Sequence, residues 1–503
     1  MRKIAFINSS VDKYSTIKLW TTDLMKSVMG NNITMMPKLV SMVFAAITPD
    51  KYEFQYIDEE IDDIDYDSID ADLIAITAMT VQAKRAYQIA DEMRKRGKTV
   101  VMGGIHASVL GDEVLEHCDA IMVGEGENTW PELLKDWESN TLKKIYNAKD
   151  YPFVDKLISP KVDIIKFDHY LQFPIQATRG CPYDCEFCSI KFSSGRKYRM
   201  KPVKQVVEEI KEFEKHNKGI FKKGYFFVDD NLYVNREYTK ELFTALKDLN
   251  ITWQGQGTID ATEDDEILKL MAESGCRNFS IGFESISQSS LEEANKPKFN
   301  IADKYSKALN KIASYGIIPA GTFIFGFDSD DISVFSKTVG FAVKQHIYSP
   351  FFNILTPLPG TRFFKRMEGE NRIKSKDWNK YNALNCVFSP KKMTSEQLQE
   401  GSYWASIEIA DMNIFREHLD YFWEKGPWDT NPRLKLYERI LLFAFGIKFW
   451  RNKDYRKFLF WSSRQKNAAD FNTIVQALLL NDMAKQLPES HDPALSMKDY
   501  VLK

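Results

Sequence analysis

Short apolar runs alternate with amphipathic stretches along the first 140 residues of the chain. Helical periodicity predicts two helices, at Val81–Arg96 and Glu113–Cys118. This alternation is typical of an open parallel sheet wrapped by helices. Because such sheets bind ligands at the carboxyl ends of their strands, we expect sites in the loops after Ile76, Met102 and Val123. The apolar runs predict the strands themselves at Lys3–Asn8, Tyr52–Asp58, Asp72–Thr77, Thr99–Gly103 and Ala120–Gly124.

A second alternating array begins near residue 174, after a mixed stretch over 141–168 that Pro152 and Pro160 interrupt and that we interpret as a linker. In the helix predicted from Val203, valine, isoleucine and phenylalanine occupy one stripe and lysine and glutamate the other. Six strand and helix cycles imply an α/β domain over 169–371, a curved and incomplete parallel barrel. Its strands are predicted at Pro174–Thr178, Gly224–Val228, Thr252–Gly257, Asn278–Phe283, Ile317–Phe325 and Phe351–Leu355.

The alternation fades after residue 371, and the remaining stretch, 372–503, is predicted to be helical, aromatic and basic. Between Arg433 and Trp461, lysines and arginines interleave with large apolar residues. Such a segment could line an apolar pocket and lie on an anionic bilayer surface, although a helical subdomain with its aromatics packed inside is the simpler interpretation. The longest apolar run, Ile440–Ile447, is too short to span a bilayer.

The composition is that of a folded globular protein, with 44% hydrophobic and 27% charged residues among 503. The net charge of -2 gives no global field that would recruit nucleic acid. Six cysteines are too few for a disulfide-built secreted fold, and the N-terminus lacks the pattern of a signal peptide. We therefore expect a cytoplasmic protein, with contact at the inner face of the membrane as a further hypothesis.

The strongest chemical signal is the segment TRGCPYDCEFCSI, directly after the first strand of the second array. It spaces Cys181, Cys185 and Cys188 as CxxxCxxC, and no fourth cysteine lies nearby in the sequence. Three thiolates on one short loop can hold one face of an iron–sulfur cube and leave one iron open for a ligand. The alternative is a zinc site made by these cysteines with a distant histidine or aspartate.

At these residues the chain resembles the radical S-adenosylmethionine (SAM) enzymes. The resemblance implies a partial (β/α)6 barrel and a 4Fe-4S cluster held by the three cysteines. It also implies that the open iron binds SAM, which one electron from the cluster cleaves to a 5'-deoxyadenosyl radical. Further contacts to SAM are implied for Phe187, Asp229, Asp230, Asn231, Glu284, Ser285 and Phe325, the last beside Gly326.

The N-terminal array resembles the Rossmann-like cobalamin-binding domain found upstream of one large radical SAM class. The segments ITAMT, VVMGGIHAS and VGEGENTWPELL carry this resemblance, and each falls on a predicted strand-end loop. No Asp-x-His-x-x-Gly motif follows the first strand, so the lower-axial histidine of mutase-type domains is missing. Cobalamin contacts are implied for Thr77, Met79, Gly103, Gly104, His106, Gly124 and Gly126.

Residues 36–372 are most similar to hopanoid-type and bacteriochlorophyll-type methylases. The resemblance implies cobalamin-dependent methyl transfer to an unactivated carbon of a lipid, isoprenoid or tetrapyrrole-like substrate, with a flavodoxin- or ferredoxin-type electron donor as partner. One alternative is a radical SAM enzyme without cobalamin that carries out cyclisation, reduction or rearrangement. A second, less favoured, is a non-catalytic, metal-stabilised binding protein.

Overall fold

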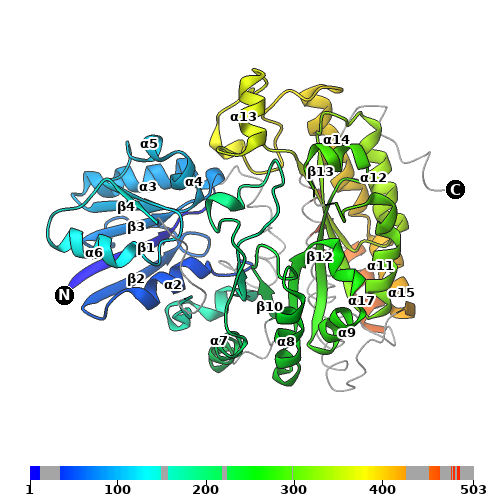
Figure 1. Ribbon diagram of the computed structural model, residues 1–503, viewed down its shortest axis with the longest axis horizontal. Helices are drawn as coiled ribbons and strands as arrows, with labels where there is room; N and C mark the ends of the chain where they lie inside the picture. The colour runs from blue at the N-terminus through cyan, green and yellow to red at the C-terminus, as the bar shows by residue number, and fades with distance from the viewer. Residues whose placement is uncertain are drawn as a thin grey trace. The chain divides into compact units, whose positions relative to one another are not determined.

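The computed structural model describes residues 1–11, 34–148, 157–217, 224–296, 298–425 and 453–464, with 477–478, 480–481, 484–485 and 487. The chain divides into two compact units (Figure 1). The first unit contains the described residues within 1–18, 32–252 and 356–388. The second contains those within 253–355 and 389–503.

The first unit begins with a six-stranded parallel sheet in the order β2-β1-β3-β4-β5-β6. All five predicted strands are confirmed, nearly residue for residue. The sixth, β6, lies inside the stretch that we interpreted as a linker. The strands are β1 (Arg2–Asn8), β2 (Tyr52–Asp58), β3 (Leu73–Thr77), β4 (Thr99–Gly103), β5 (Ala120–Val123) and β6 (Ile145–Asn147).

Helices cover both faces of this sheet (Figure 1). Alternate residues of each strand enter two different cores: Ile4 and Phe6 pack with α2 (Leu39–Ile47) and α6 (Trp130–Glu138). Ala5 and Ile7 belong to the core that contains α3 (Ala83–Lys95). Burial on both faces explains why β3, β4 and β5 are nearly continuous apolar runs, whereas β2 alternates buried and more exposed residues.

The loop after β4 forms two short helices, α4 (Ile105–Val109) and α5 (Gly111–Val114). The helix predicted over Glu113–Cys118 is wrong in extent, because the chain turns after Val114. The amide of Asp119 already donates to the Val100 carbonyl (2.8 Å) to enter the sheet.

The same unit holds the first two strands of the second array, β7 (Gln172–Ile175) and β10 (Gly224–Phe227), which pair in parallel. The predicted strand Pro174–Thr178 is split, because Thr178 begins a short antiparallel pair, β8 (Thr178–Arg179) with β9 (Arg199–Met200). Helices α7 (Val203–His216) and α8 (Arg236–Leu246) follow β9 and β10, and α7 buries the predicted apolar stripe.

Residues 356–388 also belong to the first unit, so the expected boundary at 371 falls inside it. Helix α13 (Arg362–Gly369) opens this segment. Beyond it, Trp378, Tyr381 and Val387 are buried in the same core as α3 of the N-terminal sheet.

In the second unit, β11 to β14 are parallel neighbours in sequence order, which confirms the remaining four strands. Helices separate them, and the buried rings of Phe283, Phe323, Phe352 and Phe325 contact one another in turn. The elements are β11 (Trp253–Gly257), α9 (Asp265–Glu273), β12 (Cys276–Glu284), α10 (Gln288–Glu293), α11 (Tyr305–Ser314), β13 (Ile318–Phe325), α12 (Ser333–Lys344) and β14 (Ser349–Ile354).

The helical C-terminal region is confirmed where it is described, in α14 (Ser395–Ile409), α15 (Met412–Lys425) and α17 (Lys453–Arg464). Tyr455 and Phe458 of α17 are buried, as an ordinary helical subdomain requires. Most of the basic and aromatic stretch, residues 433–452, lies outside the described residues. Within the described part of the chain, no helix has the length and apolarity needed to cross a bilayer.

Candidate cofactor sites

The loop that begins at Cys181 carries the three cysteines of the CxxxCxxC motif, which are partly exposed and form no disulfide. Its start is held by a hydrogen bond from the Cys181 amide to the Gly195 carbonyl (3.2 Å). Burial, with Cys185 and Cys181 close by, raises the pKa of the Cys188 thiol to about 12. The described side chains form no ready three-ligand metal cage. Thiolates crowded together need a cation to offset their charge, so the donor set suits a metal cluster.

Two carboxylates after β10 anchor this loop. Asp229 is fully buried and accepts hydrogen bonds from the Thr178 amide, the Thr178 hydroxyl (2.6 Å) and the Ala177 amide (3.2 Å). Asp230 accepts from the amide of Gly180 (2.8 Å), the residue before Cys181. Burial raises the pKa of Asp229 to about 7. These two residues, with buried Asn231, are among those for which contacts to SAM are implied, and in this structure the two aspartates position the cysteine loop.

A buried ion network joins the N-terminal domain to the cysteine loop. Arg179, two residues before Cys181, pairs with Glu125 (3.1 Å) and Glu127 (2.6 Å) from the loop after β5. Arg199 of β9 donates to both carboxylate oxygens of Glu125, from Nη1 to Oε2 at 2.8 Å and from Nη2 to Oε1. Only 4% of the Glu125 side chain and 2% of the Arg199 side chain are exposed. This network was not predicted from the sequence, although Arg179 lies in the cysteine motif and both glutamates lie in the segment VGEGENTWPELL.

A cavity of about 280 Å³ opens at the carboxyl edge of the N-terminal sheet. It is lined by Thr77, Gly103, Gly104, Gly124 and Gly126, five of the residues expected at cobalamin. The cysteine-loop side contributes Gln176, Arg179, Ser193 and Ser194, and apolar residues such as Val43, Phe44, Met122 and Trp130 complete the wall.

Two of these glycines allow close packing within the protein at the cavity wall. Gly104 has φ 93° and ψ -177°, a conformation essentially restricted to glycine, and an added Cβ would lie 2.7 Å from the Ala78 carbonyl oxygen. A Cβ on Gly126 would collide with the Phe44 ring. The glycines are therefore required by the shape of the cavity wall.

His106 and Met79, the other two residues expected at cobalamin, do not line this cavity. The His106 imidazole is fully buried, 2.7 Å from the Tyr87 hydroxyl, and its edge faces the Trp378 ring. Burial lowers the pKa of His106 to about 4, so it is a neutral core residue. Met79 is 46% exposed and borders a second cavity of about 270 Å³. That cavity is also lined by Val81, Ile105, Val109, Ser189, Leu358, Pro359, Tyr381 and Asn382.

The remaining residues expected at SAM are divided between the units. Phe187 is partly exposed on the cysteine loop of the first unit. In the second unit, Glu284 ends β12 with φ 62° and binds Lys296 (3.1 Å), and Ser285 follows it. The Phe325 ring is buried and stacks on Phe352 with ring centres 5.5 Å apart, so its ring faces the core.

Comparison with known proteins gives two family matches: residues 40–134 match the B12 binding domain, and residues 175–342 match the radical SAM superfamily. The chain is 38% identical over 357 residues to a bacteriochlorophyllide d C-8(2)-methyltransferase of Chlorobaculum tepidum, covering 69% of this chain and 79% of that protein. It is 26% identical to a hopanoid C-2 methylase of Rhodopseudomonas palustris, covering 69% and 67%.

Among solved structures, the cobalamin-dependent SAM radical enzyme OxsB, with aqua-cobalamin and SAM bound, superposes with a TM-score of 0.63. The alignment covers 98% of this chain and 82% of that one at 14% identity, so it speaks for the fold.

Proposed function

Since the chain belongs to the radical SAM superfamily and, within it, to the methyltransferases that carry a B12-binding domain, we propose that it methylates a carbon of a tetrapyrrole. The observation that carries this proposal is the shared wall of the first cavity. Gly104 and Gly126 of the N-terminal domain and Arg179 and Ser194 beside the cysteine loop line the same space. One compact unit thus contains both the proposed corrinoid wall and the loop that carries the three cysteines.

When bound, the cluster with SAM supplies a carbon-centred radical, and cobalamin supplies the methyl group; the protein's part is binding and orientation. Cys181, Cys185 and Cys188 would hold the cluster. Asp229 accepts from the Thr178 amide and Asp230 from the Gly180 amide, so the two carboxylates hold the backbone on either side of Arg179 and position the start of the cysteine loop.

The first cavity fits a corrinoid in two respects. Its glycine-rich floor brings backbone close to the ligand, and its apolar wall, including Phe44 and Trp130, can exclude water from one face of a flat macrocycle. His106 lies in the core and does not line this cavity. Gln176, Arg179, Ser193 and Ser194 are the polar residues that line this space from the cysteine-loop side.

The second cavity suits the substrate. It shares Ile105 with the first cavity and includes Ser189, the residue after Cys188, so it adjoins both proposed cofactor sites. Met79, Val81, Leu358 and similar side chains give it an apolar lining that can bind one edge of a macrocycle. A tetrapyrrole is favoured over a hopanoid because the relative named for a bacteriochlorophyllide reaction is 38% identical and the hopanoid methylase 26%.

The test is anaerobic turnover of the reconstituted protein with methyl-labelled SAM and a choice of a bacteriochlorophyllide-type tetrapyrrole or a hopanoid. We expect label in the tetrapyrrole, together with 5'-deoxyadenosine. Formation of 5'-deoxyadenosine with no labelled product, and with a cyclised or reduced tetrapyrrole instead, would contradict methyl transfer.

A further inference from the structure

Residues 356–366 lead from the wall of the second cavity to the cysteine loop, and we call them the α13 strap. Leu358 and Pro359 of the strap line that cavity, and so does Ser189, directly after the last cysteine of the loop. Helix α13 begins soon afterwards, at Arg362. The strap and the loop both belong to the first unit.

A tight turn sets the direction of the strap between the cavity and the helix. Gly360 has φ 82°, and a Cβ there would lie 2.9 Å from the ring of Phe192, which follows the cysteines. The Thr361 hydroxyl donates to the Leu358 carbonyl (2.6 Å) and accepts from the Phe364 amide (3.0 Å), so it caps α13. Backbone and side-chain contacts therefore hold the start of the helix in place.

The first turn of α13 is bound to the cysteine loop. The Phe363 amide donates to the Glu186 carbonyl (3.2 Å), so the loop satisfies one of the amides that a helix start leaves without an intrahelical partner. The Arg362 guanidinium donates to the Asp184 carbonyl (2.5 Å) and pairs with the Asp184 carboxylate (2.8 Å). Because Asp184 and Glu186 stand on either side of Cys185, the strap holds the backbone on both sides of this cysteine.

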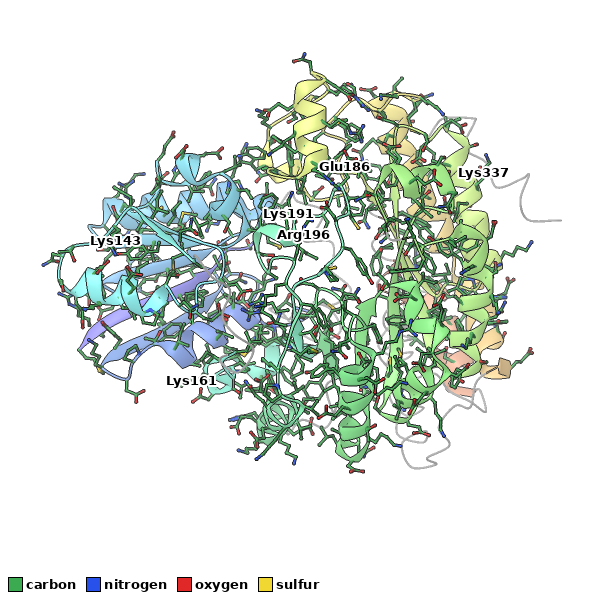
Figure 2. The ribbon with its side chains drawn as sticks, in the orientation of Figure 1. Lys143, Lys161, Glu186, Lys191, Arg196 and Lys337 are labelled. Atoms are coloured by element: carbon green, nitrogen blue, oxygen red, sulfur yellow. The ribbon has the colours of Figure 1, made fainter. Side chains whose placement is uncertain are left out.

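Arg366 binds the same loop from the next turn of the helix. Its guanidinium donates to both carboxylate oxygens of Glu186, at 2.8 and 2.9 Å, and lies over the Phe363 ring, 5.3 Å from the ring centre. Figure 2 shows Glu186 beside this helix. The side chains of Arg366 and Glu186 are 25% and 17% exposed. Two parallel hydrogen bonds between such groups fix their relative orientation as well as their distance.

We propose that Arg366 is a positioning residue for the cluster, which through Glu186 holds the span between the second and third cysteines in the conformation that binds iron. Because the strap continues into the wall of the second cavity, the cluster ligands and the substrate wall share one fixed frame. This inference rests on the proposed function, which assigns the loop to the cluster and the cavity to the substrate. Residues that orient metal ligands without binding the metal change metal affinity by about 10–100-fold when they are replaced.

The test measures hydrogen exchange by mass spectrometry in the full-length protein without its cluster. The informative peptide covers residues 181–190, where the Cys188 amide donates to the Cys185 carbonyl (3.2 Å). Exchange of such amides reports how often the loop opens locally. A second peptide, from α3, reports on the stability of the unit as a whole.

Each variant has a matched control in or beside the same helix. Arg366→Gln removes the contact to the loop, and its control, Lys376→Gln, breaks the exposed pair of Lys376 with Glu368 (2.8 Å). Gly360→Ala disturbs the turn of the strap. Its control is Gly369→Ala, where an added Cβ meets nothing within 4 Å.

We expect the 181–190 peptide to exchange about tenfold faster or more in Arg366→Gln and in Gly360→Ala than in wild type, while exchange in α3 does not change. Both controls should match wild type. Arg366→Lys should fall between wild type and Arg366→Gln, because lysine keeps the charge and loses the two parallel hydrogen bonds.

The reconstituted protein provides a second readout, the rate at which the cluster releases iron to a chelator. This rate should rise about tenfold in Arg366→Gln and stay unchanged in Lys376→Gln. Unchanged loop exchange in Arg366→Gln would overturn the inference, and so would an equal rise in the loop and in α3, which would show a general loss of stability. A normal loop in Gly360→Ala would remove the strap from the frame.

Neither measurement uses SAM or a substrate, so both are independent of the reaction. A protein that fails to methylate a tetrapyrrole but shows fast exchange and fast iron release in Arg366→Gln would refute the proposed reaction. The positioning role of Arg366 would then stand. Methylation by the wild type together with unaltered loop exchange and iron release in Arg366→Gln would refute the positioning role alone.

Discussion

At the scale of single residues, the proposed function depends on the three cysteines of the loop. Cys185→Ala should abolish reductive cleavage of SAM and lower the iron content, because three thiolates hold three of the four irons and the variant would keep only two of these ligands. The matched control is Cys386→Ala, a partly exposed cysteine of the same unit whose thiol donates to the Phe388 carbonyl (3.2 Å). The measurements are 5'-deoxyadenosine formation and iron per chain. Retained cleavage in Cys185→Ala would remove this cysteine from the ligand set.

Glu125 is the second residue on which the site depends. Glu125→Gln leaves the buried Arg199 without its charged partner, and breaking such a pair costs about 3–5 kcal/mol. Glu127→Gln should cost less, because Arg179 keeps its contact with Glu125. Urea unfolding followed by circular dichroism gives the free energies, and iron content reports on the loop. Equal losses in the two variants would contradict a central role for Glu125.

His106 makes the stability depend on pH. Its pKa in the folded protein, about 4, lies below the 6.5 of an exposed histidine, because burial disfavours the charged form. Between these pH values the unfolded chain binds a proton that the folded protein refuses, so stability falls as pH drops from about 6.5 to about 4, by about 1.4 kcal/mol for each pKa unit. Between pH 7 and pH 5, the free energy of unfolding should fall less in His106→Gln than in wild type or in the exposed control His216→Gln. Identical losses would refute this assignment.

At the scale of elements, the turn between β4 and α4 shapes the first cavity. Gly104→Ala should destabilise the first unit by about 1–3 kcal/mol more than Gly97→Ala. Both glycines have positive φ, but a Cβ at Gly97 meets nothing within 4 Å, whereas one at Gly104 meets the Ala78 backbone. Thermal unfolding and corrinoid binding of the two variants provide the comparison. A milder effect at Gly104 would mean that the turn adapts without strain.

The elements that the sequence predicted well are those whose apolar runs are long and locally bounded. Strands β3, β4 and β5 of the N-terminal sheet are of this kind, since burial on both faces favours apolar residues along most of their length. Strand β6 was missed because only Tyr146 of its three residues is buried. The packing of Trp378 and Tyr381 in the N-terminal core was not predicted for another reason. A contact between residues so distant in sequence leaves no periodic pattern.

The candidate site likewise has features that local sequence patterns predict and features that they do not. Spacing alone located the cysteine loop, and the glycines marked the cavity floor. The pairing of Arg199 with Glu125 joins residues 74 positions apart, so no local pattern announces it. Asp229 and His106 were placed in the correct loops, but which way each side chain turns depends on partners such as Thr178 and Tyr87 that only the folded chain brings close.

At the scale of the whole molecule, the first compact unit contains the N-terminal sheet, the cysteine loop and residues 356–388. Its two cavities adjoin through Ile105. Binding at the first cavity should therefore stabilise the cysteine loop through Arg179, which lines that cavity and stands two residues before Cys181. Limited proteolysis of the loop with and without added cobalamin checks this coupling, and protection is the expected outcome. Unchanged cleavage would mean that the two sites are independent.

The most direct test of the account is the joint stoichiometry of iron, sulfide and corrinoid in protein purified and reconstituted without oxygen. We expect one 4Fe-4S cluster and one corrinoid for each chain, with the cluster lost selectively in Cys185→Ala. A protein that takes up the cluster but no corrinoid would contradict the methyl-transfer mechanism, and one that holds zinc without iron or sulfide would contradict the assignment as a whole.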